Sequence, residues 1–248
     1  MGLIGHWKLD DRAASTVIVA STGLNGSLDG GDNTIDKTVS GPGGSLLFGL
    51  DLNGSDDSIA VTIASFGDGA PFSVSFWAKT DGATAGQDRY IGSSGANVPS
   101  IRKASDTTVT VASATANATF TVPAVGNTLW HHFLVTRTAG NSVRVFMDGV
   151  ESSSGAQSIA GIFAFNVLAR HSTNYFNGRL AQMKVYDTDE SAILQALYQE
   201  GVSGSNPFYS LGSSGPAYAP ATLPISTPIS KHPHRIREER LWPANTFS

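Results

Sequence analysis

The chain has 248 residues, a formal net charge of −4 at pH 7, and charged residues at only 15% of its length. Abundant Gly, Ser, Thr and Ala suit many short strands joined by tight turns and argue against a helical bundle or a coiled coil. The absence of cysteine excludes disulfides and thiolate metal sites, and the acidic balance gives no electrostatic basis for binding nucleic acid.

The N-terminal residues MGLIGHWKLDD contain no basic region followed by a long apolar run, so we expect no signal peptide. No apolar run in the sequence approaches the ~18 residues that a membrane-spanning helix needs. We therefore expect a protein made in the cytoplasm, without a membrane span.

The first part of the chain predicts short strands around acidic turns. Residues 3–9 (LIGHWKL) predict a strand, and 45–48 and 58–63 predict two more on either side of the turn 53–57. Residues 72–80 (FSVSFWAKT) alternate clearly, with Phe and Val on one face and Ser, Trp and Lys on the other.

The middle of the chain continues this pattern. Residues 107–122 (TTVTVASATANATFTV) are light and β-prone, which predicts strands with one face in water. The clearest passage is 129–150 (LWHHFLVTRTAGNSVRVFMDGV), where alternation stops for turn residues at 138–141 and again at Asp148-Gly149. This passage predicts a β-hairpin that opens into a third strand.

Two adjacent histidines begin that hairpin. His131 and His132 are neighbours on a strand, so their side chains point to opposite faces and cannot chelate one metal ion. We expect one of them to pack under the sheet and the other to face solvent.

The last patterned part predicts strands over 162–169 and 175–186. Residues 187–200 (DTDESAILQALYQE) change to helical spacing, and Gly201 is the expected C-terminal stop of that helix.

These motifs carry a family resemblance. The W-H-H passage with its V-R-V-F-M-D-G continuation, the FSVSFW strand and the closing F-x-G strand with its short helix resemble the laminin-G-like domain of the concanavalin A-like lectin/glucanase superfamily. The resemblance covers residues 3–200. It implies an all-β fold, an antiparallel two-sheet jelly-roll sandwich that ends in a short helix.

The composition divides the chain into a sandwich over residues 1–200 and an extended Pro/Gly/Ser-rich arm over 201–248. Dense proline excludes helix and central strand there, and the composition also fits a disordered linker. We expect the arm to bind a partner through aromatic anchors and basic ion-pair donors: Arg235, Arg237, Arg240, Trp242 and Phe247.

Catalytic groups are missing from the sequence pattern. A glycoside hydrolase needs two carboxylates facing one bond. None of the five glutamates has an acidic partner at strand spacing: Glu151, Glu190, Glu200, Glu238 and Glu239. The resemblance includes hydrolases, but the residues predict a protein that is not an enzyme.

Calcium is the only cofactor that the sequence suggests, because loop carboxylates bind it in many laminin-G-like domains and lectins. Asp56 and Asp57 are the best candidates, and solvated acidic turns are the alternative interpretation. Weaker candidates are Asp10, Asp11, Asp68 and Asp88. Aromatic residues that could stack on a sugar are Tyr90, Trp130 and Tyr175.

Two functions stay open. The first is a structural or assembly protein, held on a larger particle such as a phage or virion surface by its C-terminal arm, with other subunits or copies of itself as partners. The second is a carbohydrate-binding lectin module, with or without calcium, for cell-surface glycans. The sequence favours the first.

Overall fold

The structure, a computed structural model, describes residues 2–81, 88–95 and 99–202. The chain divides into two units, residues 1–211 and 212–248, and all described residues belong to the first. The arm residues Arg235, Arg237, Arg240, Trp242 and Phe247 lie outside the described residues, so their role and the domain boundary at residue 200 stay predictions.

The first sheet is antiparallel and has ten strands. Its main path runs through β15 (Val150–Glu151), β14 (Ser142–Met147), β13 (His131–Arg137), β8 (Phe72–Thr80), β20 (Asn177–Tyr186), β1 (Leu3–Trp7) and β3 (Ala20–Thr22). Outside this path, β16 (Gln157–Ser158) pairs with β14, and β6 (Leu46–Asn53) pairs with β20 and with β5 (Thr38–Gly43).

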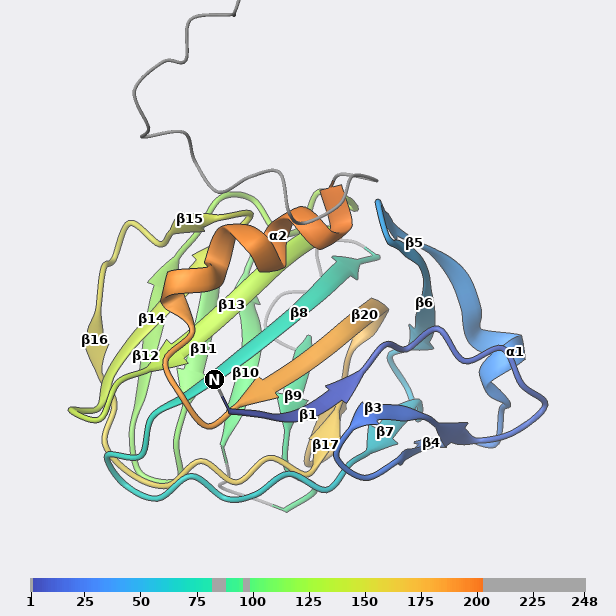
Figure 1. Cartoon of the computed structure of the whole chain (residues 1–248), viewed down its shortest axis with the longest axis horizontal. Coiled ribbons are helices and arrows are strands. Elements are labelled where there is room, and N and C mark those ends of the chain that lie inside the picture. The colour runs from blue at the N-terminus through green and yellow to red at the C-terminus, as the bar shows by residue number, and fades with distance from the viewer. Residues whose placement is uncertain (1, 82–87, 96–98, 203–248) are drawn as a thin grey trace, which may run out of the picture. The chain divides into compact units, whose positions relative to one another are not determined.

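The second sheet has eight strands and forms the other layer (Figure 1). Its order is β12 (Asn117–Thr121), β11 (Thr108–Ala112), β10 (Ser100–Ser105), β9 (Arg89–Gly92), β17 (Val167–Leu168), β7 (Ser58–Ala60), β4 (Gly26–Asp29) and β2 (Val17–Ile18). A separate two-stranded hairpin consists of β18 (Arg170–His171) and β19 (Asn174–Tyr175).

The core lies between the two sheets. Phe76 of β8 packs against Phe133 of β13 in its own sheet, with ring centroids 5.2 Å apart, and against Tyr90 of β9 in the opposite sheet, at 5.1 Å. All three side chains are 1% exposed or less. Full burial of such a ring contributes about 1.5–3 kcal/mol relative to leaving it in water. The predicted antiparallel β-sandwich is confirmed.

The helices are short: α1 (Thr34–Lys37), the 3-10 turn η1 (Ser191–Ile193) and α2 (Leu194–Val202). Figure 1 shows α2 (orange) crossing the outer face of the first sheet, over β13 and β8. Leu194 and Leu197 of α2 pack there on Leu134, Phe146 and Tyr186. In the part of the chain that the structure describes, no helix is long and apolar enough to cross a membrane.

The hairpin prediction is confirmed in detail. β13 and β14 pair antiparallel from Phe133↔Met147 to Arg137↔Val143. Asp148 and Gly149 both have positive φ, +50° and +80°, as a two-residue turn between β14 and β15 requires.

The structure corrects three details. Gly201 does not stop the helix but lies inside α2, where an added Cβ would be 2.3 Å from the Trp77 ring, so glycine allows the close contact. The strand expected at 162–169 is reduced to β17, because Phe163 forms only an isolated bridge to Phe66. Neither His131 nor His132 faces solvent, since both are at least nine-tenths buried.

The environments of the two histidines explain that burial. His132 shares the face that α2 covers, where its Nε2 is 2.9 Å from Ser75 Oγ and its ring packs on Trp77. Burial lowers the pKa of His132 to about 3. His131 lies on the opposite face, and its Nδ1 is 2.6 Å from Asp148 Oδ2.

Arg137, at the end of β13, is a fully buried charge. Its guanidinium lies 5.1 Å from the ring centroid of Phe72 and 4.8 Å from that of Phe163. Nε, Nη1 and Nη2 donate to three loop carbonyls at 2.8, 2.8 and 2.6 Å, those of Ala70, Gly161 and Gly67. The Arg137 side chain therefore links the loop at residues 67–70 and the loop at residue 161 to the end of the core.

We predict that Arg137→Met lowers the free energy of unfolding by about 3 kcal/mol, because three loop carbonyls lose the buried donor that joins them. The matched control is Arg144→Met on the same hairpin, where a half-exposed arginine pairs with Glu151. That change should reduce stability by less than about 1 kcal/mol. Urea unfolding measures both, and equal losses would contradict the role given to Arg137.

The buried His132 predicts acid-sensitive stability. Its pKa is about 3 in the folded protein and 6.5 when unfolded, so the unfolded state binds more protons between these values. Stability is then lost as pH falls below 6.5, by on the order of 4 kcal/mol at pH 3.5 from this group. His6, with its pKa lowered by burial to about 4, adds to the loss.

The measurement is the free energy of unfolding between pH 7 and pH 3.5 for the native protein and for His132→Gln. We expect a shallower pH slope in the variant. Identical slopes would show that His132 is not the titrating group.

Candidate functional site

A groove of about 540 Å³ lies over the second sheet. Ile101 of β10 and Val111 of β11 face the core, so their strand neighbours Ser100, Arg102 and Ala112 face away from it. The groove is lined by these three residues together with Arg89, Ser113, Ala114, Thr115, Ala116, Asn117 and His171.

Two arginines face each other across neighbouring strands in this groove. Arg102 of β10 is directly opposite Arg89 of β9, and Ile101 is opposite Ile91. The register therefore advances two residues on β9 for one on β10, which is a β-bulge at Tyr90. The bulge brings the two arginines into register and lets Tyr90 and Ile91 both enter the core.

No described residue forms a hydrogen bond or an ion pair with either arginine. The side chain of Arg89 is only 7% exposed. The buried Nε atoms of Arg89 and Arg102 form no hydrogen bond, and neither guanidinium pairs with a carboxylate among the described residues. Burial, assisted by the charge of Arg102, lowers the pKa of Arg89 to about 10 against the opposing effect of Asp88. Arg89 is still a cation at neutral pH.

The acidic residues closest in sequence to these arginines, Asp88 and Asp106, form ion pairs with Lys103. Lys103 is fully buried, with its Nζ 3.1 Å from Asp106 Oδ1 and 3.6 Å from Asp88 Oδ2. Burial raises the pKa of Asp88 while Lys103 lowers it. Among the described residues that line the groove there is no Asp or Glu, so its net charge is positive.

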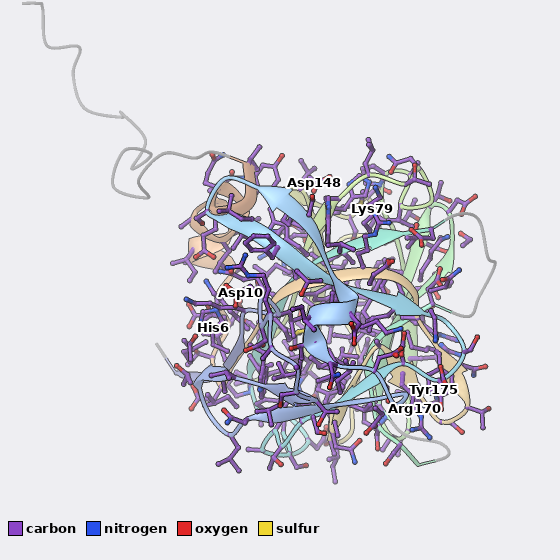
Figure 2. All side chains as sticks on the ribbon, turned by 90° about the vertical axis from the view of Figure 1, so that its right-hand side faces the viewer. His6, Asp10, Lys79, Asp148, Arg170 and Tyr175 are labelled. Atoms are coloured by element: carbon purple, nitrogen blue, oxygen red, sulfur yellow. The ribbon has the colours of Figure 1, made fainter. Side chains whose placement is uncertain are left out.

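One wall of the groove depends on a glycine. An added Cβ at Gly92 would lie 2.5 Å from the carbonyl oxygen of Arg170, so glycine lets the β18–β19 hairpin lie against β9. That hairpin places His171 in the wall. Figure 2 shows Arg170 and Tyr175 together on it, with the guanidinium 5.1 Å from the ring centroid.

The opposite wall is the turn between β11 and β12. The Ser113 hydroxyl fixes this turn by donating to Ala160 O at 2.6 Å and accepting from the backbone N–H of Ala116 at 3.0 Å. Thr115 and Asn117, which follow it, are exposed. The turn thus presents a hydroxyl and an amide at the edge of the groove.

A second, smaller pocket of about 220 Å³ lies beside α2. Its lining includes Trp77, Trp130 and Tyr198, and the rings of Trp77 and Tyr198 stack with centroids 5.8 Å apart. The indole Nε1 of Trp77 is buried without a hydrogen-bond partner.

Residues 53–192, more than half of the chain, match the family model for the concanavalin A-like lectin/glucanases superfamily. The chain belongs to this superfamily. Its antiparallel sandwich and the resemblance seen in the sequence agree with that assignment. No curated protein sequence matches the chain.

Solved structures share the fold of this lectin/glucanase-like domain at low sequence identity. Domain 4 of AbnA, a GH43 extracellular arabinanase from Geobacillus stearothermophilus, in complex with arabinotriose, has a TM-score of 0.56 and 21% identity, over 80% of this chain and 98% of that one. Trypanosoma rangeli sialidase with the inhibitor DANA has a TM-score of 0.56 and 11% identity, over 79% and 32%.

The binding domain of Paraclostridial Mosquitocidal Protein 1 is a third, with a TM-score of 0.55 and 13% identity, over 80% of this chain and 52% of that one. The chain therefore spans about a third of the sialidase and half of the mosquitocidal fragment. At these identities the likeness concerns the fold alone.

The calcium candidates of the lectin/glucanase-like domain lie away from the groove. Asp57 is fully buried, and its Oδ2 accepts from Lys37 Nζ at 2.7 Å and from the Asn53 N–H at 2.9 Å. Asp56 accepts from the Asn53 side chain. Among the residues that the structure describes, no group of three or more His, Cys, Asp or Glu could hold a metal ion, so calcium at Asp56 and Asp57 stays a prediction.

The other residues that the sequence suggested for calcium binding or sugar stacking lie in other parts of the structure. Asp11 accepts from the Val19 N–H, and Asp68 accepts from Asn141 and from the Gly161 N–H. Tyr90 is a core residue and Trp130 belongs to the smaller pocket. None of these lines the groove. Sequence reasoning missed Arg89 and Arg102, because only the bulge register makes them neighbours.

We predict that Asp57→Asn lowers the free energy of unfolding by about 2 kcal/mol, because Lys37 loses its buried partner. The geometry predicts the same loss in chelator and in millimolar calcium. Asp56→Asn, at an exposed position, is the matched control and should change stability by less than about 0.5 kcal/mol. Thermal or urea unfolding measures both. A loss that appears only in calcium would instead support the metal site.

Proposed function

We propose that the domain is a carbohydrate-binding module and that the groove over the second sheet holds its ligand. The observation that carries this proposal is the pair of unpartnered arginines, Arg89 and Arg102, in a groove without carboxylates. A buried donor that lacks a protein acceptor is unfavourable on its own, which is typical of a site that an external ligand completes.

The rest of the lining supports a glycan as that ligand. Ser100, Thr115 and Asn117 add hydroxyl and amide groups, which are the partners that sugar hydroxyls need. The side chains between them are the small Ala112, Ala114 and Ala116, which leave room for a ring.

The comparisons support the same class of ligand. Domain 4 of the arabinanase is solved in complex with arabinotriose, and this chain covers 98% of that domain. We extend carbohydrate binding to this chain from that similarity of fold, and the lining of the groove gives a physical reason to do so.

We propose binding without hydrolysis. A glycosidase places two carboxylates about 5–10 Å apart around the scissile bond. The described lining of the groove contains none, so a bound glycan would meet cations and neutral groups there.

An assembly role is a separate proposal that rests on the arm. The Pro-rich composition of residues 201–248, with Trp242 and Phe247 as anchors, supports attachment to other subunits on a particle surface, including a virion. Truncation after Gly204 should leave the sandwich folded and abolish incorporation into the particle. This proposal and glycan binding are compatible, because the arm and the groove are different parts of the chain.

We predict that filling the groove removes glycan binding. Ala112→Phe places a ring between the walls and should weaken affinity about tenfold or more on a panel of neutral and acidic glycans. Ala196→Phe, on the exposed side of α2, is the matched control and should leave binding unchanged. Calorimetric titration with the best ligand from the panel measures both.

A blank panel would overturn the proposal, and equal binding by the native protein and Ala112→Phe would move the site elsewhere. Glycoside turnover above buffer would overturn the assignment of binding without hydrolysis.

A further inference from the structure

We infer that the ligand carries an anionic group, a carboxylate or a sulfate ester, and that Arg89 and Arg102 hold that group in the groove. This inference rests on the proposed function and names the chemical class of glycan, an acidic one.

The first argument is the burial of an unpaired charge. Arg89 is 7% exposed, and its Nε has no hydrogen-bond partner. Desolvating a cation is unfavourable unless a counter-charge or hydrogen-bond acceptors replace the lost water. For the other buried arginine, Arg137, three carbonyls do this. At Arg89 the protein supplies no such acceptor among its described residues.

The second argument is repulsion between the two arginines. Arg102 directly opposes Arg89 in the sheet, and its charge helps to lower the pKa of Arg89. Like charges at opposed positions destabilise a sheet. An anion bound to both would convert that repulsion into attraction, whereas a neutral sugar would leave it unchanged.

The third argument is that no carboxylate of a described residue lines the groove. Asp88 and Asp106 form ion pairs with Lys103, and the described groove lining is free of acidic residues. The chain as a whole carries a net charge of −4, so this positive groove is a local exception. Because the chain as a whole is negative, its overall charge cannot be what attracts an anion to the groove.

The geometry also suits an anion with two oxygens on one plane. A guanidinium presents parallel N–H donors that bind a carboxylate in a bidentate manner, and a sulfate offers a similar pair of oxygens. The hydroxyl and amide groups of Thr115 and Asn117 lie at the groove edge, where they can bind the ring that carries the anion.

The test compares three probes on the full chain: a glucuronate-containing oligosaccharide, its carboxyl-reduced neutral counterpart, and a sulfated oligosaccharide of similar length. We expect the native protein to bind one or both acidic probes at least about tenfold more tightly than the neutral one. The stronger acidic probe identifies the anion as carboxylate or sulfate. Isothermal titration at two salt concentrations measures the affinities.

Arg89→Gln should reduce binding of the acidic probe about tenfold to a hundredfold and leave the neutral probe unaffected. Arg102→Gln should act in the same direction, and it keeps the test valid if the first variant folds poorly. The matched control is Arg179→Gln in the first sheet, where the arginine pairs with Asp51. It should bind like the native protein.

A second readout needs no ligand. Because Arg89 is an uncompensated buried charge, Arg89→Gln should melt at the same temperature as the native protein or a few degrees higher. The acidic probe should raise the melting temperature of the native protein and not that of the variant. A large loss of stability in Arg89→Gln without ligand would show that Arg89 is a structural residue, and would overturn the inference.

The outcomes separate the two proposals. Equal affinity for the acidic and neutral probes would overturn the anionic inference and leave carbohydrate binding intact. No binding of any glycan would overturn both. Acidic binding that survives Arg89→Gln and Arg102→Gln would place the anion at another site and overturn the inference.

Discussion

The stability of the sandwich depends on the hydrogen bonds and ring contacts made by one charged side chain that is buried in its core. Arg137 lies at the end of β13, fully buried, and the loops around residues 67–70 and 161 supply the carbonyls that replace its lost water. Its guanidinium also lies over the rings of Phe72 and Phe163, which pack on each other in the core with centroids 4.9 Å apart. The loop carbonyls, the two aromatic rings and the guanidinium stabilise one another. Removing Arg137 would leave the carbonyls without the buried donor that joins them.

Arg89 is also a buried cation, but among the described residues its Nε has no hydrogen-bond partner. It is nearly as buried as Arg137, it opposes a second arginine, and its sequence neighbour Asp88 forms an ion pair with Lys103. The described residues supply three hydrogen-bond acceptors to Arg137 and none to Arg89. On our proposal, Arg89 is kept for a ligand. Functional sites often retain interactions that reduce the stability of the free protein.

The sequence predicted the elements whose signals are local. The hairpin of β13 and β14 follows from period-2 alternation and from turn residues that accept positive φ, such as Asp148 and Gly149. The groove follows from long-range register. Residues 89 and 102 become neighbours only through a bulge in β9, and no local pattern encodes which strands pair. The prediction that one of the two histidines faces solvent was wrong for a related reason, because the contact of α2 with the outer face of the sheet, which buries His132, is a tertiary contact.

The most direct test of this account is the NMR spectrum of the arginine Nε–H groups during titration with a glucuronate-containing oligosaccharide. Signals of Arg89 and Arg102, assigned by their loss in the glutamine variants, report on the groove, and those of Arg137 and Arg144 report on the remainder of the sandwich. The account predicts large, saturable shifts for the first two and none for the others. Shifts confined to tryptophan indoles, or no shifts at Arg89 and Arg102, would contradict it.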